Sequence, residues 1–190
     1  MALYHFSVRH VSRGKGQMVV ASAAYISGQR IYDGYYNKIH DYTSKSGVVF
    51  TEILTPEYVP ERLTDRETLW NEVEHVERNN KAQLAYSFDI ALQNELTLEE
   101  NIRLEKEFCQ EQFVERGMIV DLAVHKGKSD NEEEPDNPHF HVLVPIRPFT
   151  EEGIWGNKQR REYILDEDGN RVKDAKGKEI FNAVSTTGWN

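Results

Sequence analysis

The chain has 190 residues, a net charge of −9 and 38% hydrophobic residues, which is typical of about one soluble globular domain. It contains no run of 18 apolar residues and no apolar leader, so the sequence predicts neither a membrane span nor a secreted protein. The single cysteine, Cys109, cannot form an intrachain disulfide, and together these features predict a cytoplasmic protein. The net charge of the whole chain argues against a general nucleic-acid binder. Residues 1–50 nevertheless carry a net +4, against −9 for residues 51–120 and −4 for residues 121–190, so local positive potential remains near the N-terminus.

Hydrophobic periodicity and capping signals predict alternating strands and helices. Thr64 with Glu67, and Thr97 with Glu100, match the capping-box pattern at the start of two helices. The predicted elements are, in chain order, a strand at 3–11, a helix at 18–28, a hairpin or irregular loop at 30–47, a strand at 48–54, a helix at 64–78, a strand at 84–92, a helix at 97–117, and strands at 118–125 and 139–146.

This order predicts an α/β protein of the α+β type, with an antiparallel sheet covered by helices on one side. Residues 148–190 are polar, and the Asp168–Gly169 turn predicts an exposed hairpin at the periphery of the same domain. No helix closes the chain after residue 185. We therefore expect residues 1–190 to form one domain that is truncated at its C-terminus.

Three of the seven histidines lie at the two ends of one acidic loop. Side chains alternate across a strand, so His139 and His141 share a face. An antiparallel hairpin would bring His125 beside them, on the face opposite Leu122 and Val124. Three imidazoles that leave coordination positions open can hold one divalent metal ion. The alternative is three exposed histidines on a polar strand face, with no metal.

Two carboxylates compete to orient a metal-binding histidine. Asp89 lies on the polar face of its predicted strand, and Asp121 shares a face with His125. A ligating histidine usually donates its second N–H to such a group. Either residue is equally well explained as a solvated acid. The acidic loop at 130–136 can attract a hard cation, although a hairpin tip explains it as well.

Tyr25 is the candidate nucleophile. It lies on the helix at 18–28 among small residues, which leave room for a bulky substrate to reach the phenol. The alternative is that Tyr25 fills a gap in the core. The competing tyrosines in the following loop are Tyr32, Tyr35, Tyr36 and Tyr42.

Four stretches occur in the order found in a known family: YHFSV near the start, ASAAYISG on the first helix, HDYTSKSGVVFTEIL, and NPHFHVLVPIRP after an upstream AVH. On these residues the chain resembles the MobA/MobL mobilization relaxases, which belong to the HUH endonucleases. The resemblance implies the HUH-relaxase fold, a mostly antiparallel five-stranded sheet flanked by helices. It also implies a family whose members continue well past residue 190.

The resemblance implies a mechanism. His125, His139 and His141 are expected to bind one Mn²⁺ or Mg²⁺ ion, and Tyr25 to attack a phosphodiester at a plasmid origin of transfer. The products are a 5′-phosphotyrosine and a free 3′-OH, and the same site is able to rejoin the strand. The expected proton acceptor is a neighbouring histidine or carboxylate, with Asp89 as the candidate carboxylate. Asp89 stands where the family usually has Glu, which shortens the reach of the carboxylate.

The expected partners are single-stranded DNA at the origin of transfer and accessory mobilization or coupling proteins, in the bacterial cytoplasm. Two alternatives stay open: a non-catalytic DNA-binding module of the same fold, and a replication-initiator nickase. The residues expected to contact DNA phosphates are basic and lie near the N-terminus or beside the histidines: Arg9, Arg13, Lys15, Arg30, Lys126 and Lys128.

Overall fold

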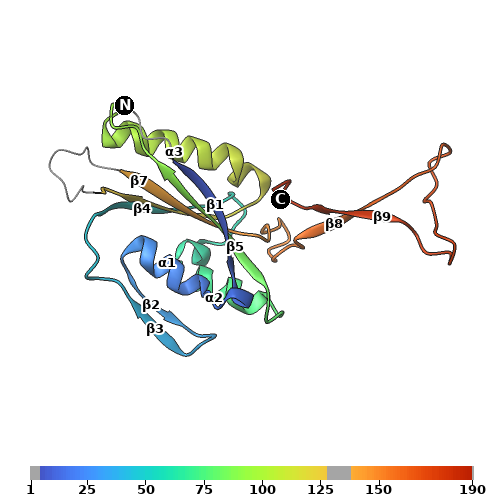
Figure 1. The fold of residues 1–190 in the computed structure, drawn as a ribbon, viewed down its shortest axis with the longest axis horizontal. Coiled ribbons are helices and arrows are strands. Elements are labelled where there is room, and N and C mark those ends of the chain that lie inside the picture. The colour runs from blue at the N-terminus through green and yellow to red at the C-terminus, as the bar shows by residue number, and fades with distance from the viewer. Residues whose placement is uncertain (1–4, 128–137, 190) are drawn as a thin grey trace.

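The computed structural model describes residues 5–127 and 138–189. A five-stranded sheet with the strand order β1-β5-β7-β6-β4 forms its centre, and every neighbouring pair is antiparallel (Figure 1). This confirms the predicted fold class. The strands are β1 (Phe6–Ser12), β4 (Val48–Leu54), β5 (Gln83–Ala91), β6 (Val120–His125) and β7 (His139–Pro145).

Helices cover both faces of the sheet, so the prediction that they cover one side is wrong. Figure 1 shows α1 (Val19–Ser27) and α2 (Arg66–Val76) on one face and α3 (Leu98–Gln112) on the other. Each face has its own hydrophobic core. All six residues of β6 are buried, including Asp121, Ala123 and His125, which point away from the α3 core. The alternation of side chains along each strand identified which residues share a face of the sheet. It did not show that helices also cover the face with the polar residues.

The predicted end of α1 and the predicted start of α3 agree with the structure. Gly28 ends α1 with φ 64°, a left-handed conformation that glycine adopts without a steric penalty. Thr97 accepts a hydrogen bond from the backbone of Glu100, and Glu100 accepts one from the backbone of Thr97, which forms the predicted capping box. The predicted end of α3 at Gly117 is wrong, because the α-helix ends at Gln112 and a separate short 3₁₀ helix, Val114–Arg116, precedes Gly117.

The start of α2 differs from the prediction. Asp65, and not Thr64, caps the helix, since its carboxylate accepts a hydrogen bond from the backbone N–H of Thr68 at 2.8 Å. The hydroxyl of Thr64 instead donates to the carbonyl of Glu61, at the end of a 3₁₀ helix. An aspartate and a threonine in succession both satisfy the capping preference, so the pattern alone does not decide between them.

Two hairpins extend this framework. The first, β2 (Arg30–Asp33) with β3 (Lys38–Asp41), follows α1 directly, as the prediction for residues 30–47 allowed. The second, β8 (Gln159–Tyr163) with β9 (Phe181–Ser185), is a narrow ribbon that projects away from the sheet and helices (Figure 1). The predicted turn at Asp168–Gly169 lies in its outer part.

Candidate metal centre and nucleophile

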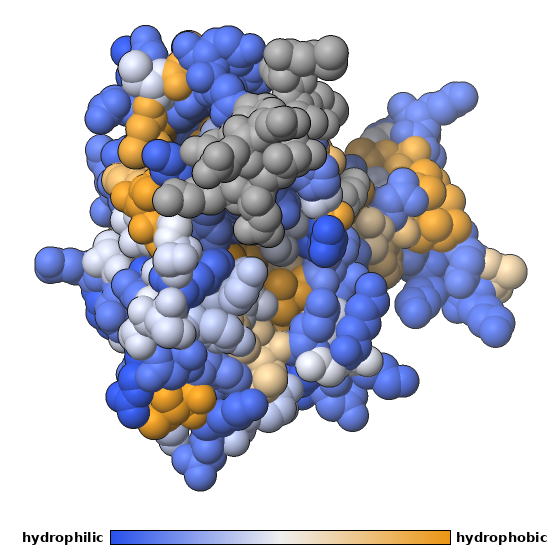
Figure 2. Space-filling model, turned by 60° about the vertical axis from the view of Figure 1, so that its left-hand side comes forward, coloured by the Kyte–Doolittle hydropathy of each residue, from blue (hydrophilic) through white to orange (hydrophobic). Residues whose placement is uncertain are grey.

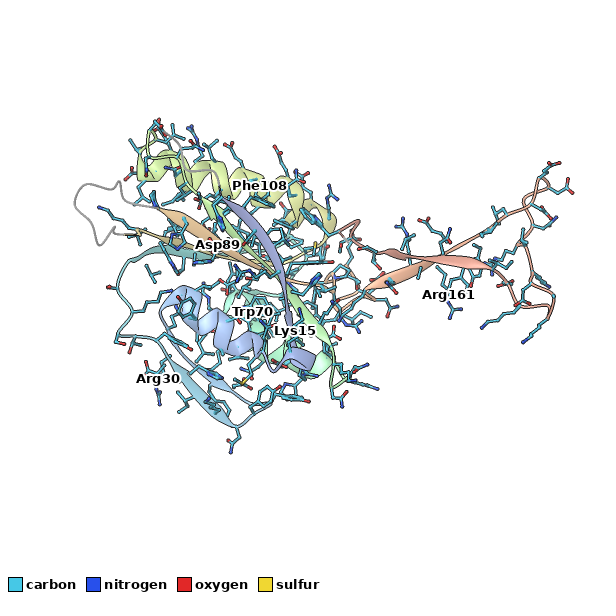
Figure 3. The ribbon with its side chains drawn as sticks, viewed as in Figure 1. Lys15, Arg30, Trp70, Asp89, Phe108 and Arg161 are labelled. Carbon is cyan, nitrogen blue, oxygen red and sulfur yellow. The ribbon has the colours of Figure 1, made fainter. Side chains whose placement is uncertain are left out.

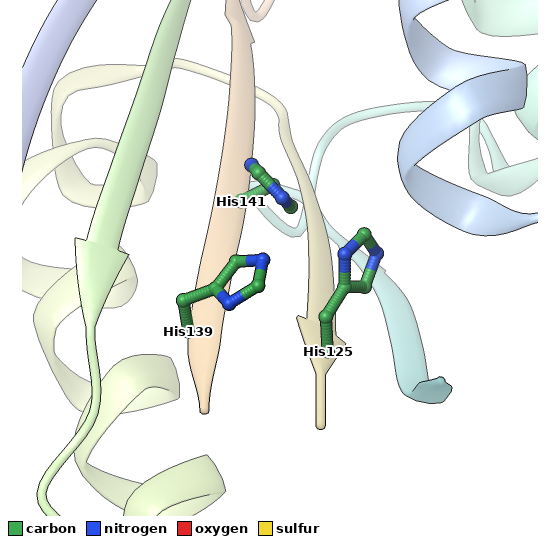
Figure 4. A group of neighbouring side chains, drawn as sticks. All are labelled: His125, His139 and His141. Carbon is green, nitrogen blue, oxygen red and sulfur yellow. The ribbon is translucent and has the colours of Figure 1, made fainter. Parts of the chain in front are cut away.

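The hairpin of β6 and β7 brings the three histidines together. His125 is paired with His139 across the two strands, and His141 is two residues further along the same face. The ring centroids are 4.6 to 5.3 Å apart, and one nitrogen from each ring lies within 4.8 Å of the other two. In Figure 4 the three rings point toward one another from the two neighbouring strands. The donor set is three imidazole nitrogens, which suits one transition-metal ion better than Mg²⁺, a cation that prefers oxygen ligands.

The backbone of α1 fixes the orientation of one of these rings. Nε2 of His125 lies 2.6 Å from the carbonyl oxygen of Ile26. A carbonyl only accepts hydrogen bonds, so Nε2 carries the proton and Nδ1 keeps its lone pair for a metal. The sequence predicted a carboxylate in this role, whereas the structure has the backbone carbonyl of Ile26. A backbone carbonyl has no signature in the sequence.

Burial keeps two of the three imidazoles, those of His125 and His141, in the neutral form. Burial, and then the neighbouring His125, lowers the pKa of His141 to about 4. Burial also lowers the pKa of His125, and the positive charge of Lys45 adds to this. Both imidazoles are therefore neutral at neutral pH, and a neutral imidazole is the ligand that a metal requires.

The two candidate carboxylates have different environments. Asp89 is half-buried and lies opposite His141 across β5 and β7. Its negative charge partly offsets the lowering of the pKa of His141 and of His125. Asp121 is fully buried and accepts hydrogen bonds from the guanidinium of Arg66 and the indole of Trp70. The alternative that Asp121 orients a histidine is therefore wrong, because its carboxylate binds α2.

Tyr25 faces the cluster from α1. It lines a cavity of about 520 Å³ together with Asp89, His141 and Tyr42, so helix and sheet contribute to one open space. Its side chain is 48% exposed, which excludes the alternative that it fills a gap in the core. Of the competing tyrosines, Tyr42 also lines this cavity and packs edge-on against Tyr25 with ring centroids 5.4 Å apart.

The predicted DNA-binding residues that the structure describes do not form one surface. Arg9 is exposed on β1 and lines the cavity of Tyr25. Lys15 and Arg30 lie far apart in the molecule (Figure 3), and Arg30 is near Asp41 at 3.6 Å. Lys126 is exposed next to His125. Lys128 lies outside the described residues.

The prediction that Arg13 contacts a DNA phosphate is wrong. Arg13 is 7% exposed and donates hydrogen bonds to the carbonyls of Glu74, Glu77 and Asn79 and to the carboxylate of Glu74. Its guanidinium also lies 4.2 Å from the ring centroid of Tyr35. Arg13 therefore holds the first strand against α2 and is not available to a DNA phosphate. An arginine in a glycine-rich loop can either contact DNA or bind a neighbouring helix, and the sequence pattern does not decide between these roles.

Within residues 5–127 and 138–189, no helix is both long and apolar enough to cross a membrane. On the face drawn in Figure 2, hydrophilic residues predominate and hydrophobic residues reach the surface in separate groups.

The fold and the site define a class of molecule: an α/β protein whose central antiparallel sheet presents a candidate three-histidine metal centre to an exposed tyrosine. The family model described as the MobA/MobL family matches residues 17–190, and the chain belongs to this family. This confirms the resemblance found in the sequence.

Curated relatives carry names from conjugation and mobilization. The chain is 37% identical to a conjugal transfer protein TraA of Agrobacterium fabrum over 100% of its own length and 18% of that protein. It is 35% identical to a probable mobilization protein MobA of Bifidobacterium longum, over 90% of the chain and 30% of that protein. The chain therefore spans less than a third of either relative.

One solved structure is similar in fold and in sequence. It is described as the molecular basis of vancomycin resistance transfer in Staphylococcus aureus. The TM-score is 0.74 and the identity 37%, over 84% of this chain and 78% of that one.

Proposed function

We propose that this chain is the nicking domain of a mobilization relaxase, which cleaves one DNA strand at an origin of transfer and stays bound to it through Tyr25. The observation that carries the proposal is the shared cavity: Tyr25 from α1, and Asp89 and His141 from the sheet, line the same open space. Family membership and the names of the relatives support the same activity. The substrate is single-stranded DNA. Accessory mobilization proteins and a location in the bacterial cytoplasm belong to the same proposal.

The three histidines are the proposed ligands of a divalent metal. When bound, the ion draws charge from the non-bridging oxygens of the scissile phosphate, which stabilises the pentacoordinate transition state. Three imidazole nitrogens favour Mn²⁺ over Mg²⁺ as the ion. The hydrogen bond from His125 to the carbonyl of Ile26 orients one ligand before the ion arrives.

The proposed step is a transesterification, in which a bond from phosphorus to Tyr25 replaces the bond from phosphorus to the 3′ oxygen. The oxygen of Tyr25 attacks phosphorus, the P–O3′ bond breaks, and the 5′-phosphate remains on the tyrosine. Asp89 accepts the phenolic proton, because it is the carboxylate that lines the same cavity. The departing 3′ oxygen takes a proton from solvent and becomes a hydroxyl. In the reverse direction, a 3′-OH attacks the phosphotyrosine and the strand is rejoined.

A covalent-adduct assay tests this proposal. Labelled single-stranded origin DNA and Mn²⁺ are incubated with the protein and separated on a denaturing gel. We expect an adduct with the unaltered chain and none with Tyr25→Phe, which removes only the nucleophilic oxygen. The matched control is Tyr32→Phe, an exposed tyrosine on β2 that does not line the cavity, and it should react normally.

The outcomes separate the alternatives. DNA binding without any adduct supports a non-catalytic module of the same fold. An adduct that persists in Tyr25→Phe and disappears in Tyr42→Phe moves the nucleophile to the other tyrosine of the cavity. Nicking of replication-origin DNA in preference to transfer-origin DNA supports a replication initiator.

A further inference from the structure

Lys45 lies directly over the ring of Tyr25. Its ammonium nitrogen is 3.5 Å from the centroid of the ring, and it donates a hydrogen bond of 3.0 Å to the backbone carbonyl of Tyr25. Lys45 belongs to the segment that follows β3, 20 residues away along the chain. Of the two residues, only Tyr25 was a candidate from the sequence.

Tyr42 holds the same ring from a second direction. Its ring meets Tyr25 edge-on, with an interplanar angle of 87°. The segment from Tyr42 to Lys45 is itself anchored, since the N–H of Tyr42 donates to the carbonyl of Gln29 and the N–H of Lys45 donates to the carbonyl of Tyr42. A face contact and an edge contact on one ring leave it little freedom to turn, although Tyr25 is half exposed.

A simpler explanation accounts for part of this arrangement. A lysine near the end of a helix commonly hydrogen-bonds a terminal carbonyl, and Tyr25 lies in the last turn of α1. That role requires contact with the backbone alone. It does not require the ammonium group to lie over the ring of the proposed nucleophile, 3.5 Å from its centroid.

We propose that Lys45 is a positioning residue for Tyr25, which holds the phenol toward the cavity by a cation–π contact. The inference rests on the proposed function, in which Tyr25 is the nucleophile. The fixed cation also stabilises the negative charge that develops on the phenolic oxygen. Because this oxygen is the attacking group in cleavage and the leaving group in rejoining, Lys45 accelerates both directions.

Three variants test the proposal. Lys45→Met keeps most of the aliphatic stem and removes the charge, and Lys45→Arg keeps a cation that stacks on aromatic rings. The matched control is Lys38→Met, an exposed lysine on the neighbouring strand β3. For each variant, the rate of adduct formation is measured in a single turnover at saturating labelled DNA, together with the Kd for DNA and the rate of rejoining.

We expect Lys45→Met to slow both cleavage and rejoining by roughly 10- to 100-fold, the cost of a misplaced reacting group. The Kd should change by less than about threefold, since a contact to the ring does not bind DNA, and Lys45→Arg should recover most of the rate. Wild-type rates in Lys45→Met overturn the proposal. So does a loss that appears entirely in Kd, or a Lys45→Arg variant as slow as Lys45→Met.

An NMR measurement tests the contact without any reaction, so it separates this proposal from the proposed function. Protons of the Lys45 side chain that lie over an aromatic face resonate upfield of their usual position. Tyr25→Leu should return them to that position, and Tyr32→Leu should not. If the Lys45 protons resonate at ordinary positions in the unaltered chain, the contact does not form and the proposal is wrong, whatever Tyr25 does chemically.

Discussion

The two faces of the central sheet are both buried, but different groups bury them. Toward α3, the contacts come from aromatic and aliphatic side chains, among them Phe88, Phe113 and Val142. Toward α1 and α2, apolar residues share the interface with buried ionic groups, notably Arg66 with Asp121. Hydrophobic contacts are non-directional, whereas hydrogen bonds between charged groups fix a geometry. The buried ionic groups therefore fix the positions of the helices on the side of the sheet where α1 carries Tyr25.

Directional contacts connect the helix that carries Tyr25 to the rest of the structure. The carboxylate of Glu74 on α2 accepts a hydrogen bond from the N–H of Val19, at the start of α1. Near the other end, the carbonyl of Ile26 contacts His125. Because α2 is in turn bound to β6 through Asp121, buried polar contacts join the helix that carries Tyr25 to the strand that carries His125.

The substitution with the largest expected effect, Asp121→Ala, breaks these contacts. Asp121→Ala leaves the Arg66 guanidinium buried without its carboxylate, and also removes the partner of the Trp70 indole. Loss of one member of a buried pair costs about 3–5 kcal/mol. Urea unfolding should show this loss, and Glu52→Ala, which breaks an exposed pair with Lys106, should cost less than about 1 kcal/mol. Equal effects of the two changes would contradict the contrast between buried and exposed pairs.

The α3 face contains the opposite kind of group, a buried acid that has no hydrogen-bond partner among residues 5–127 and 138–189. Glu105 is 3% exposed, neither of its carboxyl oxygens is hydrogen-bonded within these described residues, and burial raises its pKa to about 8. The folded state therefore keeps a proton that the unfolded state releases near its ordinary pKa of 4.5. Because the unfolded state binds fewer protons in between, stability falls as pH rises from about 4.5 to about 8.

Glu105→Gln should remove this pH dependence. At pH 8 and above we expect the variant to be more stable than the unaltered chain by roughly 2–4 kcal/mol, with a much smaller difference near pH 4.5. Unfolding by urea at a series of pH values measures it. Glu107→Gln, on the exposed side of the same helix, is the matched control. Parallel stability curves for Glu105→Gln and the unaltered chain would show that Glu105 is not buried as a neutral acid.

Local patterns in the sequence were sufficient to predict the histidine cluster. Two apolar runs of strand length, joined by one loop, determine a hairpin, and the alternation of side chains then puts His125, His139 and His141 on one face. The capping box at Thr97 is equally local, because its donor and acceptor lie three residues apart. Features that depend on short separations, or on the pairing of adjacent strands, could be inferred before the structure.

Features that depend on distant segments could not be inferred. Arg13 meets Glu74 across 61 residues, and Lys45 reaches Tyr25 from a loop that has no periodicity. Both are cations in polar segments, and only the packed structure shows that one binds a carboxylate and the other an aromatic ring. The second covered face of the sheet was missed for the same reason, since alternation identifies a face without identifying what packs on it.

The candidate metal centre gives a smaller expected effect. His139→Ala removes one of the three proposed nitrogen ligands and should weaken Mn²⁺ binding by more than tenfold, as measured by calorimetry. His75→Ala, on the surface helix α2, is the control and should bind normally. The unaltered chain should also bind Mn²⁺ more tightly than Mg²⁺, because all three donors are imidazoles. Unchanged Mn²⁺ binding in His139→Ala would place the metal elsewhere.

The smallest expected effect contrasts two arginines near the start of the chain. Arg9 is exposed at the cavity of Tyr25, whereas Arg13 is buried against Glu74. If Arg9 neutralises one phosphate of single-stranded DNA, Arg9→Ala should reduce the slope of log K against log salt by about 0.7 and weaken binding a few-fold. Its urea unfolding curve should not change, since no buried contact is lost.

Arg13→Met should do the reverse, with lower stability and an unchanged salt slope in the protein that remains folded. Fluorescence anisotropy at several salt concentrations, paired with unfolding curves, measures both. If Arg9→Ala leaves the slope unchanged, the strand does not pass Arg9, and its phosphates must be bound by other exposed cations, of which Lys126 beside His125 is the first to test.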